Sequence, residues 1–89
     1  MKRLLLTSQF KKDLKRYKHN AKVLQTLRII LQYLVEGKDI PKQYKPHWLK
    51  GSLNRYMECH LESDTLLLWL DIDNQIIKLV RLGSHSEIF

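Results

Sequence analysis

The sequence predicts a single α+β domain over residues 1–89, in which two N-terminal helices pack on one face of a four-stranded, mainly antiparallel sheet in the order β-α-α-β-β-β. Two observations predict this fold class. Helical spacing of apolar residues is confined to the chain before Gly37, whereas strand-like patterns dominate after Arg55. A chain of 89 residues also suffices for one two-layer core but not for two.

The N-terminal part is expected to form a short strand, Lys2 to Leu6, and then an amphipathic helix capped by Thr7 or Ser8. The apolar stripe of this helix follows i, i+4, i+7 spacing and consists of Phe10, Leu14 and Tyr17. Basic residues cover its other faces: Lys11, Lys12, Lys15, Arg16 and Lys18. Because Tyr17 belongs to the stripe, we expect it to pack in the core.

A second helix is expected between Asn20, which suits an N-cap, and Gly37, which suits a C-cap. Its apolar residues recur at helical spacing: Val23, Leu24, Leu27, Ile30, Leu31, Leu34 and Val35. The two helices should therefore form an antiparallel pair on the sheet. His19 is interpreted as an ordinary residue of the turn between them.

The segment from Lys38 to Asn54 is predicted to be an irregular loop, because it contains two prolines and a glycine. Long loops in small domains are more often functional than incidental. Pro46 restricts the residue before it to extended conformations and so helps to present His47 and Trp48.

An antiparallel meander is expected to complete the sheet, with strands at Arg55 to Leu61, Thr65 to Leu70 and Gln75 to Leu82. The middle strand is almost wholly apolar and should be buried on both faces. Asp71 to Asn74 has the composition of a turn, and Gly83 to Phe89 forms a short tail. The helices leave the other face of the sheet open, rimmed by the loop and the tail.

The first meander strand has period-two polarity. Its apolar side chains, Met57, Cys59 and Leu61, should face the core, and the polar ones, Tyr56, Glu58 and His60, should face the open side. The open face of this strand therefore offers either acid-base groups or an ordinary wet sheet surface.

The net charge of +7 indicates a polyanionic partner, such as RNA, DNA, an anionic membrane or an acidic protein, with a merely solubilising basic surface as the alternative. The single cysteine, Cys59, cannot form an internal disulfide, and the apolar run Leu4 to Leu6 is too short for a membrane span. We therefore expect a cytoplasmic protein without membrane association.

Three histidines in the second half of the chain, His47, His60 and His85, would supply acid-base groups that titrate near neutral pH. RNA cleavage needs a base for the 2′-hydroxyl, an acid for the departing 5′-oxygen and cations for the phosphate. Arg81 is a candidate cation, although in an unbroken strand it would share a face with Ile77 and Leu79; a bulge or a twist at the end of the strand could turn it outward.

Other chemistry is less well supported. Phe89, Trp48 and Tyr56 are candidates for base stacking, whereas Trp69 lies in the apolar strand and is expected in the core. Asp64 is by composition a turn residue. No pair of His or Cys residues has a common zinc-binding spacing, and no phosphate-binding glycine loop is present, so the sequence predicts no metal and no cofactor.

Three segments, Tyr44 to Gly51, Arg55 to Asp64 and Arg81 to Phe89, resemble the YafQ branch of the RelE/ParE superfamily of bacterial type II toxins. The resemblance extends over essentially the whole chain. It implies a RelE-like microbial RNase fold, ribosome-dependent endoribonuclease cleavage of mRNA in the A site, and neutralisation by a cognate antitoxin encoded alongside. Charge complementarity predicts that this antitoxin offers an acidic and apolar segment.

The resemblance also assigns site residues. It implies a catalytic set of His47, His60, Asp64 and His85, and it matches Arg81 and Phe89 to substrate-binding positions. Lys50, one of the loop lysines that are candidate cations, and Glu58, on the open face of the strand, are the other predicted substrate-binding residues. We expect His85 and one of the other two histidines to form the acid-base pair, Asp64 to orient a histidine, and Arg81 to hold the scissile phosphate. Two alternatives remain open: a ParE-like toxin that is not a nuclease, and a non-catalytic RNA-binding module.

Overall fold

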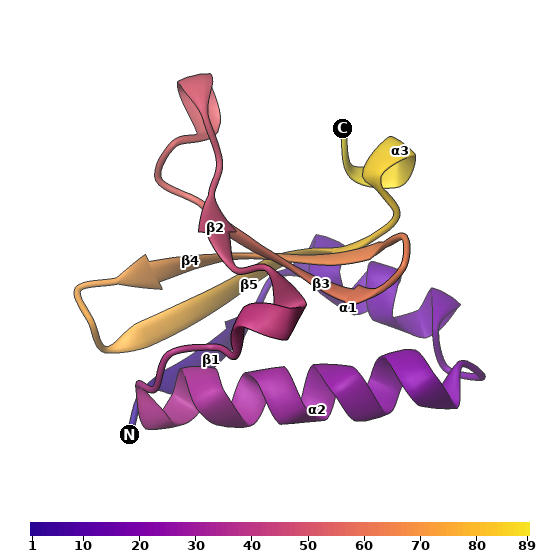
Figure 1. Ribbon diagram of the computed structural model, residues 1–89, viewed down its shortest axis with the longest axis horizontal. Helices are drawn as coiled ribbons and strands as arrows, with labels where there is room; N and C mark the ends of the chain where they lie inside the picture. The colour runs from indigo at the N-terminus through magenta and orange to yellow at the C-terminus, as the bar shows by residue number, and fades with distance from the viewer.

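The computed structural model describes all 89 residues and consists of two layers, with helices covering one face of a mixed sheet (Figure 1). The strand order is β1-β5-β4-β3-β2, with β1 parallel to β5 and the other pairs antiparallel. The strands are β1 (Arg3–Leu6), β2 (His47–Trp48), β3 (Met57–Glu62), β4 (Thr65–Ile72) and β5 (Ile76–Gly83). The predicted α+β class and the order of the main elements are confirmed.

Two main helices, α1 (Ser8–Arg16) and α2 (Ala21–Glu36), lie on the same face of the sheet. Thr7 caps α1 by accepting a hydrogen bond from the Phe10 amide, and Asn20 caps α2 in the same way through Val23. Gly37 ends α2 with a φ of 69°, in the left-handed region that favours glycine. The predicted caps are therefore confirmed. Helix α1 packs mainly against β5, and α2 against β3.

The core lies between the helices and the sheet. Its largest fully buried members come from α1, α2, β4 and β5: Phe10, Ile30, Leu67, Ile77, Leu79 and Leu82. From β3, Cys59 and Leu61 belong to this core and Met57 packs against it, while Glu58 and His60 lie outside it, as the period-two pattern predicts. Trp69 is in the core as expected, with 3% of its surface exposed.

The sheet has five strands rather than the four predicted, because the segment expected to be a loop contains β2. Two short 3-10 helices, η1 (Lys42–Tyr44) and η2 (Gly51–Leu53), flank this strand. A two-residue strand is too short to give a periodic signal, and only its pairing with β3 forms it. Strand β4 is also longer than predicted, since the turn is limited to residues 73–75, in which Asp73 and Asn74 have φ angles of 52° and 58° that suit a tight hairpin.

The C-terminal tail, predicted to be irregular, forms one helical turn, α3 (His85–Ile88). Ser84 and Glu87 form a capping box at its start. Helix α3 and the η2 loop both rise from the face of the sheet opposite α2, one at each side (Figure 1). Leu66 and Leu68 of β4 are buried but lie outside the core cluster on the helix side, which places them on this second face. No helix is long and apolar enough to span a membrane.

Candidate active site

A cleft of about 490 Å³ lies between the η2 loop and α3, on the face of the sheet opposite α2. It is lined by residues from three separate segments: His47, Trp48, Leu49, Lys50, Leu53, Glu58, His85 and Phe89. Five of the eight predicted site residues belong to this lining, namely His47, Lys50, Glu58, His85 and Phe89. The fold thus brings together groups that are up to 42 positions apart, from 47 to 89.

One wall of the cleft consists of β2 and β3, which we call the strand wall. Strand pairing places His47 directly opposite Glu58. The imidazole Nε2 lies 3.1 Å from Glu58 Oε1, and Nδ1 lies 2.7 Å from the carbonyl oxygen of Lys45. The Glu58 side chain is only 7% exposed, whereas that of His47 is 45% exposed. A buried carboxylate therefore fixes the orientation of an accessible histidine.

His60 follows Glu58 on the same face of β3 and stands beside His47, with ring centroids 6.1 Å apart. It is half-buried and makes no hydrogen bond within the protein, so its ring nitrogens are free for a substrate. Although the sequence spacing predicted no metal site, one ligand atom from each of His47, Glu58 and His60 lies within 4.8 Å of the others. Two imidazoles and a carboxylate form a donor set suited to copper or zinc.

Cys59 takes no part in this site. It points into the core from the opposite side of β3 and is fully buried. Burial, reinforced by the neighbouring Glu58 charge, raises the pKa of the Cys59 thiol to about 12. The thiol is therefore neither a nucleophile nor a metal ligand at neutral pH.

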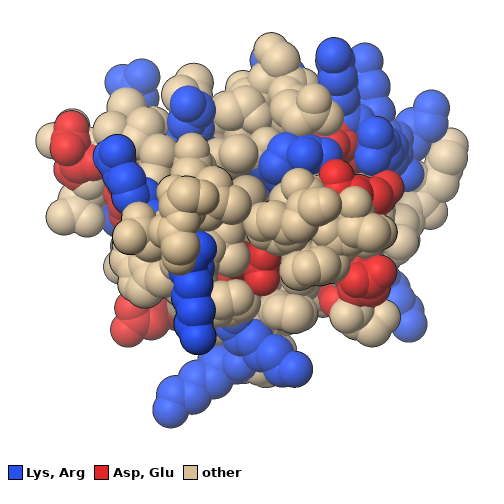
Figure 2. Space-filling view, turned by 90° about the horizontal axis from the view of Figure 1, so that it is seen from above, with Lys and Arg blue, Asp and Glu red and all other residues tan.

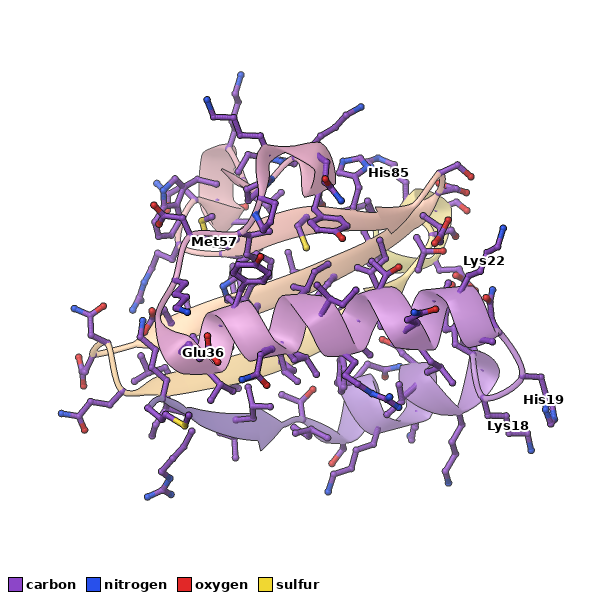
Figure 3. The ribbon with its side chains drawn as sticks, turned by 60° about the horizontal axis from the view of Figure 1, so that its bottom comes forward. Lys18, His19, Lys22, Glu36, Met57 and His85 are labelled. Carbon is purple, nitrogen blue, oxygen red and sulfur yellow. The ribbon has the colours of Figure 1, made fainter.

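The other wall of the cleft is α3, which we call the tail wall. His85 and Phe89 are one helical turn apart and face each other, with ring centroids 5.0 Å apart. Phe89 is 48% exposed, so its ring is available for stacking on a base. In Figure 3, His85 lies on the side of the sheet opposite α2. His19 lies at the turn between α1 and α2, away from the cleft, as predicted.

Arg81 is turned outward by a β-bulge, one of the two possibilities that the sequence left open. The register of β4 and β5 shifts between Leu68 and Trp69, so Arg81 pairs with Leu68 while Leu79 stays in the core opposite Trp69. The guanidinium does not line the cleft. It reaches α1, where Nε and Nη2 donate to the two oxygens of Asp13 at 2.8 and 3.3 Å.

Asp13 is completely buried and binds the backbone of β5 beyond Leu79, where β1 no longer pairs with this strand. Besides Arg81, it accepts hydrogen bonds from the Leu82 amide at 2.9 Å and from Gln9 at 3.1 Å. Burial alone would raise the pKa of Asp13, but the hydrogen bonds from Arg81, Leu82 and Gln9 outweigh it and lower this pKa below its ordinary value. The same contact raises the pKa of Arg81.

Asp64 is exposed in the turn between β3 and β4 and makes no hydrogen bond within the protein. Its expected role in orienting a histidine stays a prediction, as does phosphate binding by Arg81.

Two polar residues that organise the site were not identified from the sequence, although both left a signal. Asp13 is the one acidic residue of α1 and lies three residues after Phe10, on the apolar stripe. Glu87 follows Ser84 at the spacing of a capping box. A carboxylate on an apolar stripe indicates a buried polar contact, and a capping box in an apparent tail indicates a short helix.

The face that contains the cleft has a mixed but predominantly basic surface. Figure 2 views the molecule from the side of the η2 loop and α3, and Lys and Arg side chains are spread over it with Asp and Glu groups between them. This agrees with the net charge of +7 and with a polyanionic ligand.

Comparison with known proteins identifies the family. The family described as "Bacterial toxin of type II toxin-antitoxin system, YafQ" matches residues 2–89. The chain belongs to this YafQ family of toxins. It is 27% identical over 84 residues to the mRNA interferase toxin YafQ of Escherichia coli K12, with 93% of this chain and 90% of the relative covered. The resemblance predicted from the three segments is therefore confirmed.

Solved structures of bacterial toxins match this chain over its whole length. The crystal structure of a copper-bound mutant toxin from Helicobacter pylori matches with a TM-score of 0.91 and 32% identity, covering 100% of both chains. The toxin in the Escherichia coli DinJ-YafQ complex matches with a TM-score of 0.87 and 27% identity, covering 100% of this chain and 99% of that one.

Proposed function

We propose that this YafQ-family toxin is an endoribonuclease that cleaves mRNA and thereby inhibits translation. The observation that carries the proposal is the cleft in which His47 and Glu58 face His85 and Phe89, with His60 adjacent. Its groups meet the needs of metal-independent phosphodiester cleavage, and the Escherichia coli relative is named an mRNA interferase.

In the proposed reaction, a base removes the proton of the 2′-hydroxyl, the 2′-oxygen attacks the phosphorus, and an acid protonates the 5′-oxygen that leaves. His85 acts from the tail wall and one histidine acts from the strand wall. Both ring nitrogens of His47 face oxygen acceptors, Glu58 and the Lys45 carbonyl. His60 has no such partners, which favours His60 as the group that exchanges a proton with the RNA.

The remaining predicted residues would bind the substrate. Lys50 is an exposed cation on the cleft lining, and Phe89 and the 61% exposed Trp48 present aromatic rings at opposite sides. Base stacking on such rings contributes about 1–3 kcal/mol per base. Arg81 still has Nη1 without a partner in the protein, so it retains a donor for a phosphate if the RNA passes over β5.

We further propose that the mRNA is presented in the ribosomal A site and that an antitoxin neutralises the protein. The basic surface supports binding to a ribonucleoprotein, and the complex of the Escherichia coli relative with DinJ supports an antitoxin partner. Co-purification with the product of the adjacent open reading frame checks the second statement, and the absence of a complex would contradict it.

Cleavage of mRNA on programmed ribosomes tests the catalytic proposal. The wild-type chain should produce discrete 5′ ends, and His85→Ala and His60→Ala should each lower the rate by a factor of about 100 to 10,000, the usual contribution of a general acid or base. His19→Ala, outside the cleft, is the matched control and should cleave normally. Full activity in both cleft variants would reject the site, and intact mRNA with DNA damage would favour a ParE-like toxin.

We also propose that His47, Glu58 and His60 bind a divalent transition-metal ion in a form of the protein that does not cleave RNA, because a metal-bound His60 cannot exchange a proton with the substrate. The proximity of the three ligand atoms supports this, and a Helicobacter pylori relative is described as copper-bound. Calorimetric titration with Cu²⁺ or Zn²⁺ should detect one site in the wild type and in His85→Ala, and none in His60→Ala. Equal binding by His60→Ala would contradict the assignment.

A further inference from the structure

Helix α3 carries two residues of the proposed site but is too short to maintain its own position. It has four residues, a single turn, and isolated helices of this length are unstable in water. None of these residues is buried, so α3 contributes nothing to the hydrophobic core. The placement of His85 and Phe89 must therefore depend on polar contacts with the rest of the molecule.

Glu87 makes most of these contacts. Its Oε1 accepts from the Ser84 amide at 2.7 Å and from the Tyr17 hydroxyl at 3.3 Å, and its Oε2 accepts from Arg16 Nη1 at 3.1 Å. The hydrogen bonds from the Ser84 backbone and hydroxyl lower the pKa of Glu87, so the carboxylate is charged at neutral pH. Two of the three donors belong to the C-terminal end of α1.

A second connection joins α3 to the same helix. Arg81 donates from Nη2 to the carbonyl oxygen of Glu87 at 3.4 Å while its Nε donates to Asp13 of α1. Gly83 permits the close approach of the carboxylate, since a Cβ at this position would lie 3.0 Å from Glu87 Oε1. The tail wall is thus attached to α1 by side chains rather than by strand pairing.

We propose that Glu87 is a positioning residue for RNA cleavage: by binding Arg16 and Tyr17 it holds α3 against α1, and so fixes His85 and Phe89 at the cleft. The inference rests on the proposed nuclease function. Glu87 does not line the cleft and acts only through its neighbours. Misplacement of a reacting group by about 1 Å lowers rates by a factor on the order of 100.

The first test compares Glu87→Ala with Glu36→Ala in the ribosome-programmed cleavage assay. Glu36 is an ion-paired carboxylate at the far end of α2 (Figure 3). Glu87→Ala should lower kcat by a factor of roughly 10 to 100 and raise KM by a smaller factor, because Phe89 is displaced together with His85 while the substrate-binding groups of the strand wall remain in place. Glu36→Ala should behave as wild type. An inactive wild type rejects the nuclease function, whereas an active wild type with an equally active Glu87→Ala rejects positioning.

The second test needs no activity. In the wild type, the Phe89 ring should shift the NMR resonances of the His85 ring protons, and in Glu87→Ala these should move to random-coil positions while those of His47 stay unchanged. Arg16→Gln and Tyr17→Phe should each give a smaller shift, and neither should add to the effect of Glu87→Ala, since their shared partner is then absent. Unchanged His85 resonances in Glu87→Ala, or fully additive effects, would overturn the proposal.

Discussion

Each wall of the cleft presents an exposed histidine, His47 or His85, but the two walls hold their histidines by different means. The strand wall is built from backbone pairing of β2 with β3 and from a buried carboxylate, Glu58, beneath His47. The tail wall is one helical turn, attached to α1 through Glu87 and through the Asp13 and Arg81 pair. The comparison teaches that one half of the site shares the stability of the sheet, and the other half depends on a few polar contacts.

Removing the buried carboxylate of Asp13, which binds Arg81 and the β5 backbone, should have the largest effect on stability. Asp13→Ala leaves the partly buried Arg81 guanidinium and the Leu82 amide without their acceptor. We expect the free energy of unfolding to fall by about 3 kcal/mol, the lower end of the range for breaking a buried ion pair. Urea unfolding measures the change, with the exposed Asp39→Ala as control. A loss of unfolding free energy below about 1 kcal/mol would mean that the contact of Asp13 with Arg81 contributes little to stability.

Breaking the strand wall should cost less. His47→Ala leaves the carboxylate of Glu58, 7% exposed, without its partner, and we expect a loss of about 2 kcal/mol in unfolding free energy. In the double variant His47→Ala/Glu58→Gln the charge is gone, so part of the loss should be recovered. If the double variant is less stable than His47→Ala, the buried charge is not the cause.

Acid should weaken the tail wall through Asp13. Because its pKa is lowered in the folded protein relative to about 3.9 in the unfolded chain, the charge stabilises the fold above that value, and this stabilisation is lost as the pH falls through the folded pKa. The difference in unfolding free energy between wild type and Asp13→Asn should be constant above about pH 5 and should shrink below about pH 4. Urea unfolding at pH 7 and pH 3 checks this; an equal difference at both values contradicts it.

The smallest change in stability should come from the exposed pair of Arg16 and Glu87. Their side chains are 54% and 37% exposed, so Arg16→Gln should alter the unfolding free energy by less than about 1 kcal/mol. If the tail wall depends on this contact as proposed, Arg16→Gln should lower the rate of mRNA cleavage even though the protein stays folded. Parallel losses of activity and folded protein, measured by circular dichroism at the assay temperature, would indicate a purely structural role.

Much of the fold was predictable because it depends on local patterns. Asn20 and Gly37 delimit α2 through their own conformational preferences, and period-two polarity assigned Cys59 and Glu58 to opposite faces of β3. The five cleft residues were proposed from histidine content and from family resemblance. A bulge was one of two possible ways to turn Arg81 outward, and the choice between them depends on the register of β4 with β5.

The sequence by itself determined the α+β class, the N-caps of α1 and α2, the C-terminal end of α2, the core face of β3 and the residue types available for acid-base chemistry, because these follow from side-chain polarity and from near neighbours in the chain. Only the tertiary structure decided that β2 forms, that Glu58 lies beneath His47, and that Asp13 and Glu87 fasten the C-terminal turn to α1. These features arise from contacts between residues up to 71 positions apart, and no local pattern specifies which distant groups will meet.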